Sequence, residues 1–393
     1  KVRPGVTYSP TLVENEITRL ERQGQREGVD FLRVEPRISR NDRDLTLDVE
    51  FVISRGNRVF VERIDIEGKT TTLDRVIRRQ FRVAEGDPFN PREIRDAAER
   101  IRALDYFTVA DVNAREGSSP DQVVIDVDVE ERPTGALNFG GAFSQDDGFG
   151  LIVSFTERNF LGRGQTLGFN FSTAEESEQY GINFVEPAFL GRDVAFGLNL
   201  QYAETDSSHA NYDTESLFLQ PSLTFPVTER ARLQLRYNYT ENEQIARDPL
   251  TNGVIVQREI DAGEQASSSI GYTYTYDTRD RGLNPNAGVL IEFSQDFAGV
   301  GGDSEFIRTR GRITGQRLAF NEEVTLRATL EAGYLAWNGG TNRTIDRFVL
   351  GPSVIRGFEP GGIGPRALTT AGDDPDPLGG TLFVAARTSP RSI

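Results

Sequence analysis

The first part of the chain mixes helix-like and strand-like patterns of apolar residues. Apolar side chains recur at helical spacing after Pro10, which predicts a helix. Two strand-like runs follow, Phe31 to Ile38 and Leu45 to Ile53, with a turn at Asn41 and Asp42. This order predicts part of a small α+β module over residues 1–57.

A second α+β module is predicted over residues 58–133. The pattern predicts a strand, two helices and two strands, in that order, at 59–66, 73–81, 91–104, 107–114 and 123–129. The segment Gly5 to Pro10 resembles Gly86 to Pro91, and each precedes a helix and then two strands. The two modules therefore read as a tandem array, in which the first lacks its opening strand and helix.

From Gly135 onward the helical period disappears and apolar residues alternate with polar ones. The clearest example runs from Ile270 to Tyr276, with a large apolar side chain at every second position. Such strands, with short turns on one side and longer loops such as 206–211 and 245–263 on the other, are typical of a membrane-spanning antiparallel barrel. A soluble β-sandwich gives the same alternation, but few segments here are apolar on both faces.

The pattern predicts about twelve strands over residues 134–393. The last of them is expected at Thr381 to Ala386, and residues 387–393 do not continue the alternation. A repeated segment, Glu157 to Arg163 and Glu186 to Arg192, is predicted to form the same turn twice, because each copy ends a strand with Phe-Leu-Gly.

A long Gly- and Pro-rich stretch at 339–380 interrupts the strands and is too long for a simple turn. It contains the motif Val354, Ile355, Arg356, Gly357 and Phe358. An arginine between bulky apolar residues and glycine suggests a loop folded into the lumen, where Arg356 would pair with carboxylates of the inner wall. A solvated loop with an incidental arginine is the alternative, and the residues alone leave both open.

Composition narrows the class of function. A net charge of −16, from 60 acidic and 44 basic residues, argues against nucleic-acid binding. There is no cysteine and one histidine, His209, which lies among polar loop residues. We therefore expect no enzyme activity, no catalytic residue, no metal site and no cofactor. No apolar run is long enough for a membrane-spanning helix.

Several motifs in sequence order resemble the BamA-like outer-membrane assembly family. These are the segment ending Val129 to Gly135, Asn159-Phe160-Leu161-Gly162, Tyr276 to Asp280, Gly299 to Gly302, and the Arg356 motif between Arg347-Phe348 and Gly361 to Pro365. Residues 58–133 resemble the POTRA domain next to the barrel, and the Arg356 motif resembles the loop-six motif of the family. The resemblance covers nearly the whole chain.

The resemblance implies a protein of the Gram-negative outer membrane with its POTRA modules in the periplasm. It implies folding and insertion of outer-membrane proteins, by strand addition at POTRA edges and at a lateral barrel seam. The expected partners are unfolded outer-membrane protein precursors, accessory outer-membrane lipoproteins, periplasmic chaperones and the lipid bilayer, with no nucleic acid. A two-partner-secretion or related translocating pore of the same superfamily is the alternative.

Site residues follow from the same resemblance. The first strand would lie at the seam, with Gly135, Leu137, Phe139, Gly140, Gly141 and Phe143. Arg356 would dock on an acidic patch of the inner wall. The barrel of the family has about sixteen strands, whereas about twelve are predicted over residues 134–393. The barrel of this sequence is therefore expected to be incomplete. Ser389 stands near the position where an acidic partner for Arg356 is expected.

Overall fold

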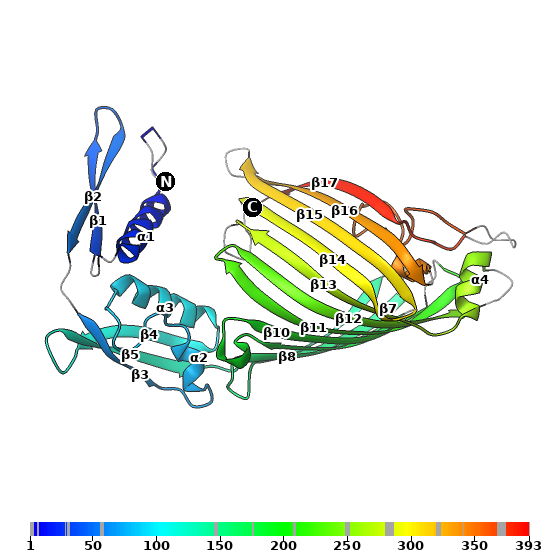
Figure 1. Cartoon of the computed structure of the whole chain (residues 1–393), viewed down its shortest axis with the longest axis horizontal. Coiled ribbons are helices and arrows are strands. Elements are labelled where there is room, and N and C mark those ends of the chain that lie inside the picture. Colours follow the sequence, from blue (N-terminus) through cyan, green and yellow to red (C-terminus); the bar gives the residue numbers. More distant parts are fainter. Residues whose placement is uncertain are drawn as a thin grey trace. The chain divides into compact units, whose positions relative to one another are not determined.

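The computed structural model divides into two compact units, which are treated separately below (Figure 1). The module unit comprises Lys1–Thr134 with the turn Leu161–Arg163, and the sheet unit comprises Gly135–Phe160 and Gly164–Ile393. The structure describes residues 4–5, 8–27, 29, 32–55, 59–144, 148–174, 177–206, 210–247, 252–279, 287–319, 324–340, 342–367 and 375–392.

The first part of the module unit is a helix packed on a two-stranded hairpin. Helix α1 (Pro10–Arg26) covers the antiparallel strands β1 (Leu32–Asn41) and β2 (Thr46–Arg55). The buried contacts come from Val13, Ile17 and Val34, so the helical spacing after Pro10 does mark the packed face.

The second part of the module unit has a three-stranded sheet covered by two helices. Its elements are β3 (Phe60–Glu67), α2 (Asp74–Arg78), α3 (Pro91–Ala103), β4 (Phe107–Glu116) and β5 (Gln122–Glu131). The sheet order is β3-β5-β4, with β3 parallel and β4 antiparallel to β5. Helix α2 is shorter than the predicted 73–81. Ile77, Ile101 and Ile125 are fully buried in the core between helices and sheet.

The residues Asn90 and Pro91 account for the start of helix α3. The Asn90 side chain accepts a hydrogen bond of 3.0 Å from the Arg92 backbone N–H, and Pro91 occupies the first helical position.

At the end of β5, the Glu131 carboxylate accepts hydrogen bonds from the backbone N–H groups of Thr71 and Thr72 and from the Thr70 hydroxyl. Burial alone would raise the pKa of Glu131, but these hydrogen bonds outweigh it and lower the pKa to about 2.

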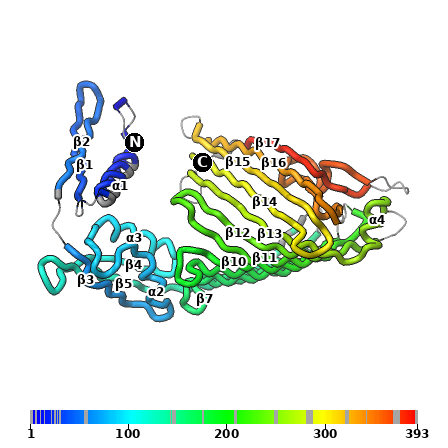
Figure 2. Tube along the Cα trace, in the orientation of Figure 1, coloured from blue at the N-terminus to red at the C-terminus, as the bar shows by residue number. Residues whose placement is uncertain are grey.

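The sheet unit is one 12-stranded antiparallel sheet in which neighbours in the sheet are neighbours in sequence (Figures 1 and 2). The strands are β6 (Gly135–Ser144), β7 (Gly148–Phe160), β8 (Gln165–Thr173), β9 (Ser177–Glu186), β10 (Ala195–Thr205), β11 (Tyr212–Thr228), β12 (Ala231–Ala246), β13 (Gln265–Asp277), β14 (Gly288–Gly302), β15 (Ser304–Ala319), β16 (Val324–Gly340) and β17 (Leu382–Ser392). The predicted fold class, α+β modules followed by an all-β antiparallel sheet of about twelve strands, is confirmed. In the described chain, β6 and β17 are the edges of this sheet and do not pair with each other.

Two expectations for this unit are wrong. Strand β17 continues to Ser392, in register with β16 from Leu382↔Tyr334 to Ser392↔Val324, whereas the sequence pattern suggested an end at Ala386. The pattern is lost because polar residues occupy the later positions, yet backbone pairing does not require apolar side chains.

The second wrong expectation concerns the predicted loop 245–263, which contains helix α4 (Val254–Asp261). This helix packs through Val256 on Ala367 and Leu378, contacts that no local pattern encodes.

The repeated Phe-Leu-Gly segments do form the same turn. Leu161 and Leu190 both have φ of 54°, and the following Gly162 and Gly191 have φ of 68° and 73°. Two successive left-handed residues close each turn, and glycine takes this conformation without strain. The second copy includes the 3-10 turn η1 (Phe189–Gly191). Among the described residues, no helix is both long and apolar enough to cross a membrane.

Candidate functional site on the inner face of the sheet

The strand registers divide the side chains of the sheet unit between two faces. Paired residues share a face, and every second residue along a strand returns to it. One face is largely apolar over its central rows and includes Phe155, Phe169, Ile182, Leu200 and Leu219, which follow one another across β7 to β11. We call this the outer face. The opposite, inner face is polar and lines the cavity described below.

The inner face differs between its two halves. From β6 to β11, the register-paired inner positions carry no charged side chain: they are Asn, Gln, Ser, Thr, Gly and Ala with a few apolar residues. From β12 to β17, the inner positions carry arginines and carboxylates: Arg232, Arg236, Asp277, Glu292, Asp296, Arg308, Arg310, Arg312, Arg327, Glu331 and Arg387. Charge is therefore concentrated on the half that ends at β17.

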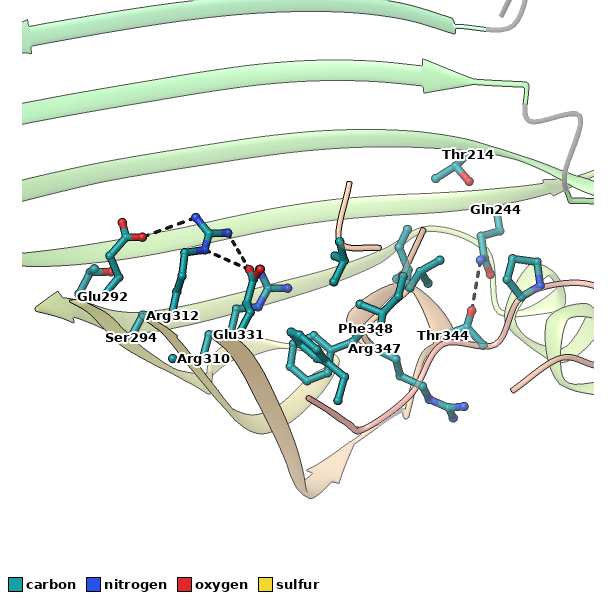
Figure 3. Close-up of a pocket in the computed structure, with 18 of the residues that line it drawn as sticks. Thr214, Gln244, Glu292, Ser294, Arg310, Arg312, Glu331, Thr344, Arg347 and Phe348 are labelled. Atoms are coloured by element: carbon teal, nitrogen blue, oxygen red, sulfur yellow. Dashed lines mark hydrogen bonds and ion pairs between the residues drawn. The ribbon is translucent and has the colours of Figure 1, made fainter. Parts of the chain in front are cut away.

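Three arginines of β15 form a ladder on the charged half. Arg312 lies between two carboxylates, 2.7 Å from Glu331 on β16 and 3.5 Å from Glu292 on β14 (Figure 3). Arg310 has no carboxylate within ion-pair distance among the described residues, and its guanidinium lies 5.0 Å from the centre of the Phe348 ring. Each rung therefore meets a different partner.

The remaining rung is Arg308. Its guanidinium stacks 4.8 Å from the centre of the Phe306 ring and lies 3.8 Å from the Asp346 carboxylate. Because Phe348 and Asp346 belong to the segment between β16 and β17, two rungs of the ladder hold that segment against the wall.

Residues of the segment 342–367 and of the inner face line a cavity of about 570 Å³ that is open to its surroundings. Phe348 is 3% exposed and packs edge-on against Phe383 of β17, with ring centres 4.9 Å apart. The cavity walls combine apolar residues of the segment with polar residues from distant strands. Its lining includes Tyr212 and Val354. Figure 3 labels four other lining residues, Gln244, Arg310, Glu331 and Phe348. The long segment thus lies inside the curve of the sheet, against the charged half.

The predicted loop-six motif lies at the border of this cavity. Val354 lines it and Ile355 is half-buried, whereas Arg356 and Gly357 are exposed and Phe358 is 48% exposed. Gly357 has φ of 94°, which favours glycine. Within the described part of the chain, no ion pair or hydrogen bond joins Arg356 to a carboxylate, so its docking on an acidic wall stays a prediction.

A different arginine holds the motif. Arg387 of β17 donates hydrogen bonds to the carbonyl oxygens of Ser353 (2.6 Å) and Val354 (3.2 Å). Arg387 was not among the predicted site residues, because the sequence pattern suggested that the last strand ends at Ala386. Continued alternation would have placed Arg387 on the inner face, two residues after Ala385. Ser389 lies on the same face, opposite Arg327 of β16.

The predicted seam strand is the edge strand β6, which pairs only with β7 among the described strands. Its outer-face residues are strongly exposed: Leu137 by 66%, Phe139 by 81% and Phe143 by 77%. Gly135 and Gly141 share that face and Gly140 lies on the inner face. The geometry is that of an open edge with an apolar outer face, and its role as a seam stays a prediction.

Catalytic and metal chemistry was not expected from the sequence. His209 lies outside the described residues. Among those described, no group of three or more His, Asp or Glu side chains has a metal-binding arrangement.

Comparison with known proteins gives two family matches. The Omp85 superfamily domain matches residues 159–391, and the surface antigen variable number repeat, a POTRA domain, matches residues 59–132. The outer membrane protein assembly factor BamA of Neorickettsia risticii is 26% identical over 387 residues, which are 98% of this chain and 51% of that protein. The chain thus spans about half the length of this curated relative.

Two solved structures show the same fold. BamA of Haemophilus ducreyi lacking POTRA domains 1–3 has a TM-score of 0.70 and 23% identity, over 98% of this chain and 77% of that one. CdiB of Acinetobacter baumannii has a TM-score of 0.55 and 14% identity, over 92% of this chain and 66% of that one.

Proposed function

We propose that this chain, which belongs to the Omp85 superfamily, acts in the outer membrane of a Gram-negative bacterium as an assembly factor that folds and inserts β-barrel proteins. The observation that carries the proposal is the direct succession of a small α+β module and an antiparallel sheet with an apolar outer face and a polar inner face. The BamA relative supports assembly over other activities.

The module would receive precursors at its free sheet edge. Strand β4 is an edge of the β3-β5-β4 sheet, so its outward backbone groups can pair with an added strand. Such pairing depends on backbone hydrogen bonds and therefore suits unfolded outer-membrane protein precursors of many sequences. Periplasmic chaperones would deliver these precursors, and accessory outer-membrane lipoproteins would bind the modules.

The edge strand β6 would supply the second pairing surface, within the lipid bilayer. Gly140 and Gly141 weaken this strand, since an interior glycine costs about 0.5–1 kcal/mol relative to alanine. A weakly held edge exchanges partners readily, and the exposed Phe139 and Phe143 would keep it in lipid while it does so. Pairing at this edge would lower the barrier to insertion without ATP or a cofactor.

Reconstitution of the full-length protein in liposomes tests this function. We expect the protein to accelerate the folding of an urea-unfolded barrel precursor, followed as heat-modifiable gel mobility. Arg356→Ala should slow it if the loop-six motif acts in assembly. Arg192→Ala is the matched control, because Arg192 is an exposed arginine in a turn at the opposite end of the strands.

One alternative from the sequence resemblance is a two-partner-secretion or related protein-translocating pore of the same superfamily. The same liposomes distinguish it. Export of a secreted partner protein, with no acceleration of barrel folding, would replace the assembly proposal. Both the assembly factor and the pore are proposed to act without enzyme activity. Hydrolysis of a lipid or peptide substrate by the liposomes would contradict that proposal.

A further inference from the structure

A short turn at the start of the long segment is buried and strongly polar. It consists of Arg343 and the 3-10 turn η2 (Thr344–Asp346), and we call it the root turn. Arg343 is 3% exposed, Thr344 1% and Asp346 7%. Buried polar and charged groups are costly unless they are paired, so the partners of these side chains define what the turn does.

The charged residues of the root turn join two strands. Arg343 Nε donates to Asp346 Oδ2 at 2.9 Å, and Arg343 Nη1 donates to the carbonyl oxygen of Gln265, the first residue of β13, at 3.0 Å. Asp346 Oδ2 also accepts from the hydroxyl of Ser304, the first residue of β15, at 3.3 Å. Arg308 of β15 donates to the Asp346 carbonyl oxygen.

Thr344 joins the root turn to two further elements. Its backbone N–H donates to both oxygens of Glu259 on α4, at 2.9 and 3.0 Å, and its hydroxyl donates to Glu259 Oε2 at 2.7 Å. Gln244 Nε2 of β12 donates to the Thr344 hydroxyl at 3.4 Å (Figure 3). Burial raises the pKa of Glu259, although the Thr344 hydrogen bonds oppose the shift.

The far end of the segment is held as well. Asp376 is fully buried, and its Oδ1 accepts a hydrogen bond of 2.8 Å from the Asn211 backbone N–H, next to the start of β11. Between these two ends, the Arg356 motif is exposed or half-buried. The paired buried charges therefore lie at the root of the segment and not at its motif.

We propose that the root turn, through Arg343, Thr344 and Asp346, is the positioning site that fixes residues 347–367 against the inner wall. By holding β12, β13, β15 and α4 at once, it sets where the segment enters the lumen. The assembly role of this position rests on the function proposed above. Positioning and assembly are therefore measured separately.

These 393 residues contain no cysteine, so a cysteine introduced among them is a unique labelling position within this part of the protein. Spin labels would be placed on the full-length protein at Ser353→Cys in the segment and Val227→Cys at the end of β11, both exposed. Asp346→Asn removes the charge but keeps the size. We expect the fraction of molecules with the label-to-label distance of the docked segment to fall about tenfold. The reason is that Arg343 is then a buried charge without its partner.

Three variants make this result specific. Glu359→Gln breaks an exposed ion pair with Arg366 within the same segment and should leave the distances unchanged. Asp346→Glu keeps the charge and should restore part of the docked population. Thr344→Val replaces the hydroxyl with a methyl group of similar size. It becomes the test variant if heat-modifiable mobility shows that Asp346→Asn does not fold.

An unchanged distance distribution in Asp346→Asn, or in Thr344→Val if the former does not fold, overturns the proposal. A shifted distribution with slower precursor folding supports both the positioning role and the assembly function. A shifted distribution with unchanged precursor folding supports the positioning role, and shows that assembly does not need the docked segment.

Discussion

The module unit and the sheet unit bury opposite kinds of side chain. The complete module buries Val76, Ile77, Ile101 and Ile125 almost fully, as a water-soluble domain does. In the sheet unit the largest exposures include Phe139 at 81% and Phe143 at 77%, while many polar side chains are buried. The buried polar residues there include Asn242, Gln244, Ser267, Ser268, Ser269, Thr314, Arg343 and Asp346. The difference teaches that one chain is built for two solvents, water around the module and lipid around the sheet.

The apolar core of the module should give the largest effect. Ile101→Ala removes a fully buried side chain and is expected to destabilise the module by about 4 kcal/mol, through lost burial and a residual cavity. Hydrogen exchange of the module amides in the whole chain measures this. Val109→Ala, at a residue 42% exposed on β4 of the same module, is the control and should cost less than about 1 kcal/mol. Equal effects would mean that the module has no such core.

A charge introduced on the outer face of the sheet tests whether that face is surrounded by lipid. Phe169→Arg, in the middle of β8, should cost about 3 kcal/mol in a bilayer, where arginine is poorly solvated. Ser172→Arg on the inner face of the same strand should cost less than about 1 kcal/mol, because that face is polar. Urea titration of the protein folded in lipid vesicles compares the two. A reversed order would exchange the assigned faces.

The paired inner charges should give a smaller effect. Asp296 lies 2.7 Å from the Arg236 guanidinium and accepts a hydrogen bond from Asn238, and the Arg236 side chain is 9% exposed. Asp296→Asn leaves Arg236 without its counter-charge and should cost about 2 kcal/mol. Glu292→Gln is the control, since Arg312 keeps Glu331. The same vesicle titration applies, and equal costs would show that the inner wall is uniformly solvated.

The smallest effect concerns pH and the module alone. The pKa of Glu131 is about 2 in the folded chain, below its ordinary value, so its contribution to stability is complete above the unfolded pKa near 4.3. This contribution is lost as the pH falls from about 4.5 to about 2. Glu131→Gln should cost roughly 1 kcal/mol at pH 7, since the group is solvent-screened, and much less at pH 2, where the folded-state carboxyl is about half protonated. Module hydrogen exchange at both pH values checks this, and a pH-independent cost would contradict it.

Much of the fold could be predicted because period-two alternation is a local property. The run from Ile270 to Tyr276 lies entirely within β13, and its aromatic residues share the outer face with Phe293 and Phe297 of the next strand. The terminal extension of β17 could not be predicted, because the polar residues from Arg387 onward break the alternation without breaking the backbone ladder.

The candidate site was less predictable than the fold. The motif at Arg356 marked the right segment, yet the arginines that hold this segment, Arg308 and Arg387, come from strands β15 and β17. Their contacts depend on register and on the path of the segment, which no local pattern encodes. Helix α4 was missed for the same reason, since it is stabilised by contacts with Ala367 and Leu378 rather than by strong local periodicity.

The sequential order of the sheet also bears on how it forms. Every strand pair joins neighbours in sequence, so from β6 to β16 the sheet can grow one strand at a time, whereas β17 pairs with β16 only across the long segment. The contacts of the long segment are of another kind. Thr344 meets Glu259 across 85 residues, and Asn211 meets Asp376 across 165. Such contacts have a high closure entropy unless the strands between them are already ordered. The wall from β6 to β16 would therefore form first, and the segment would dock late, together with the pairing of β17.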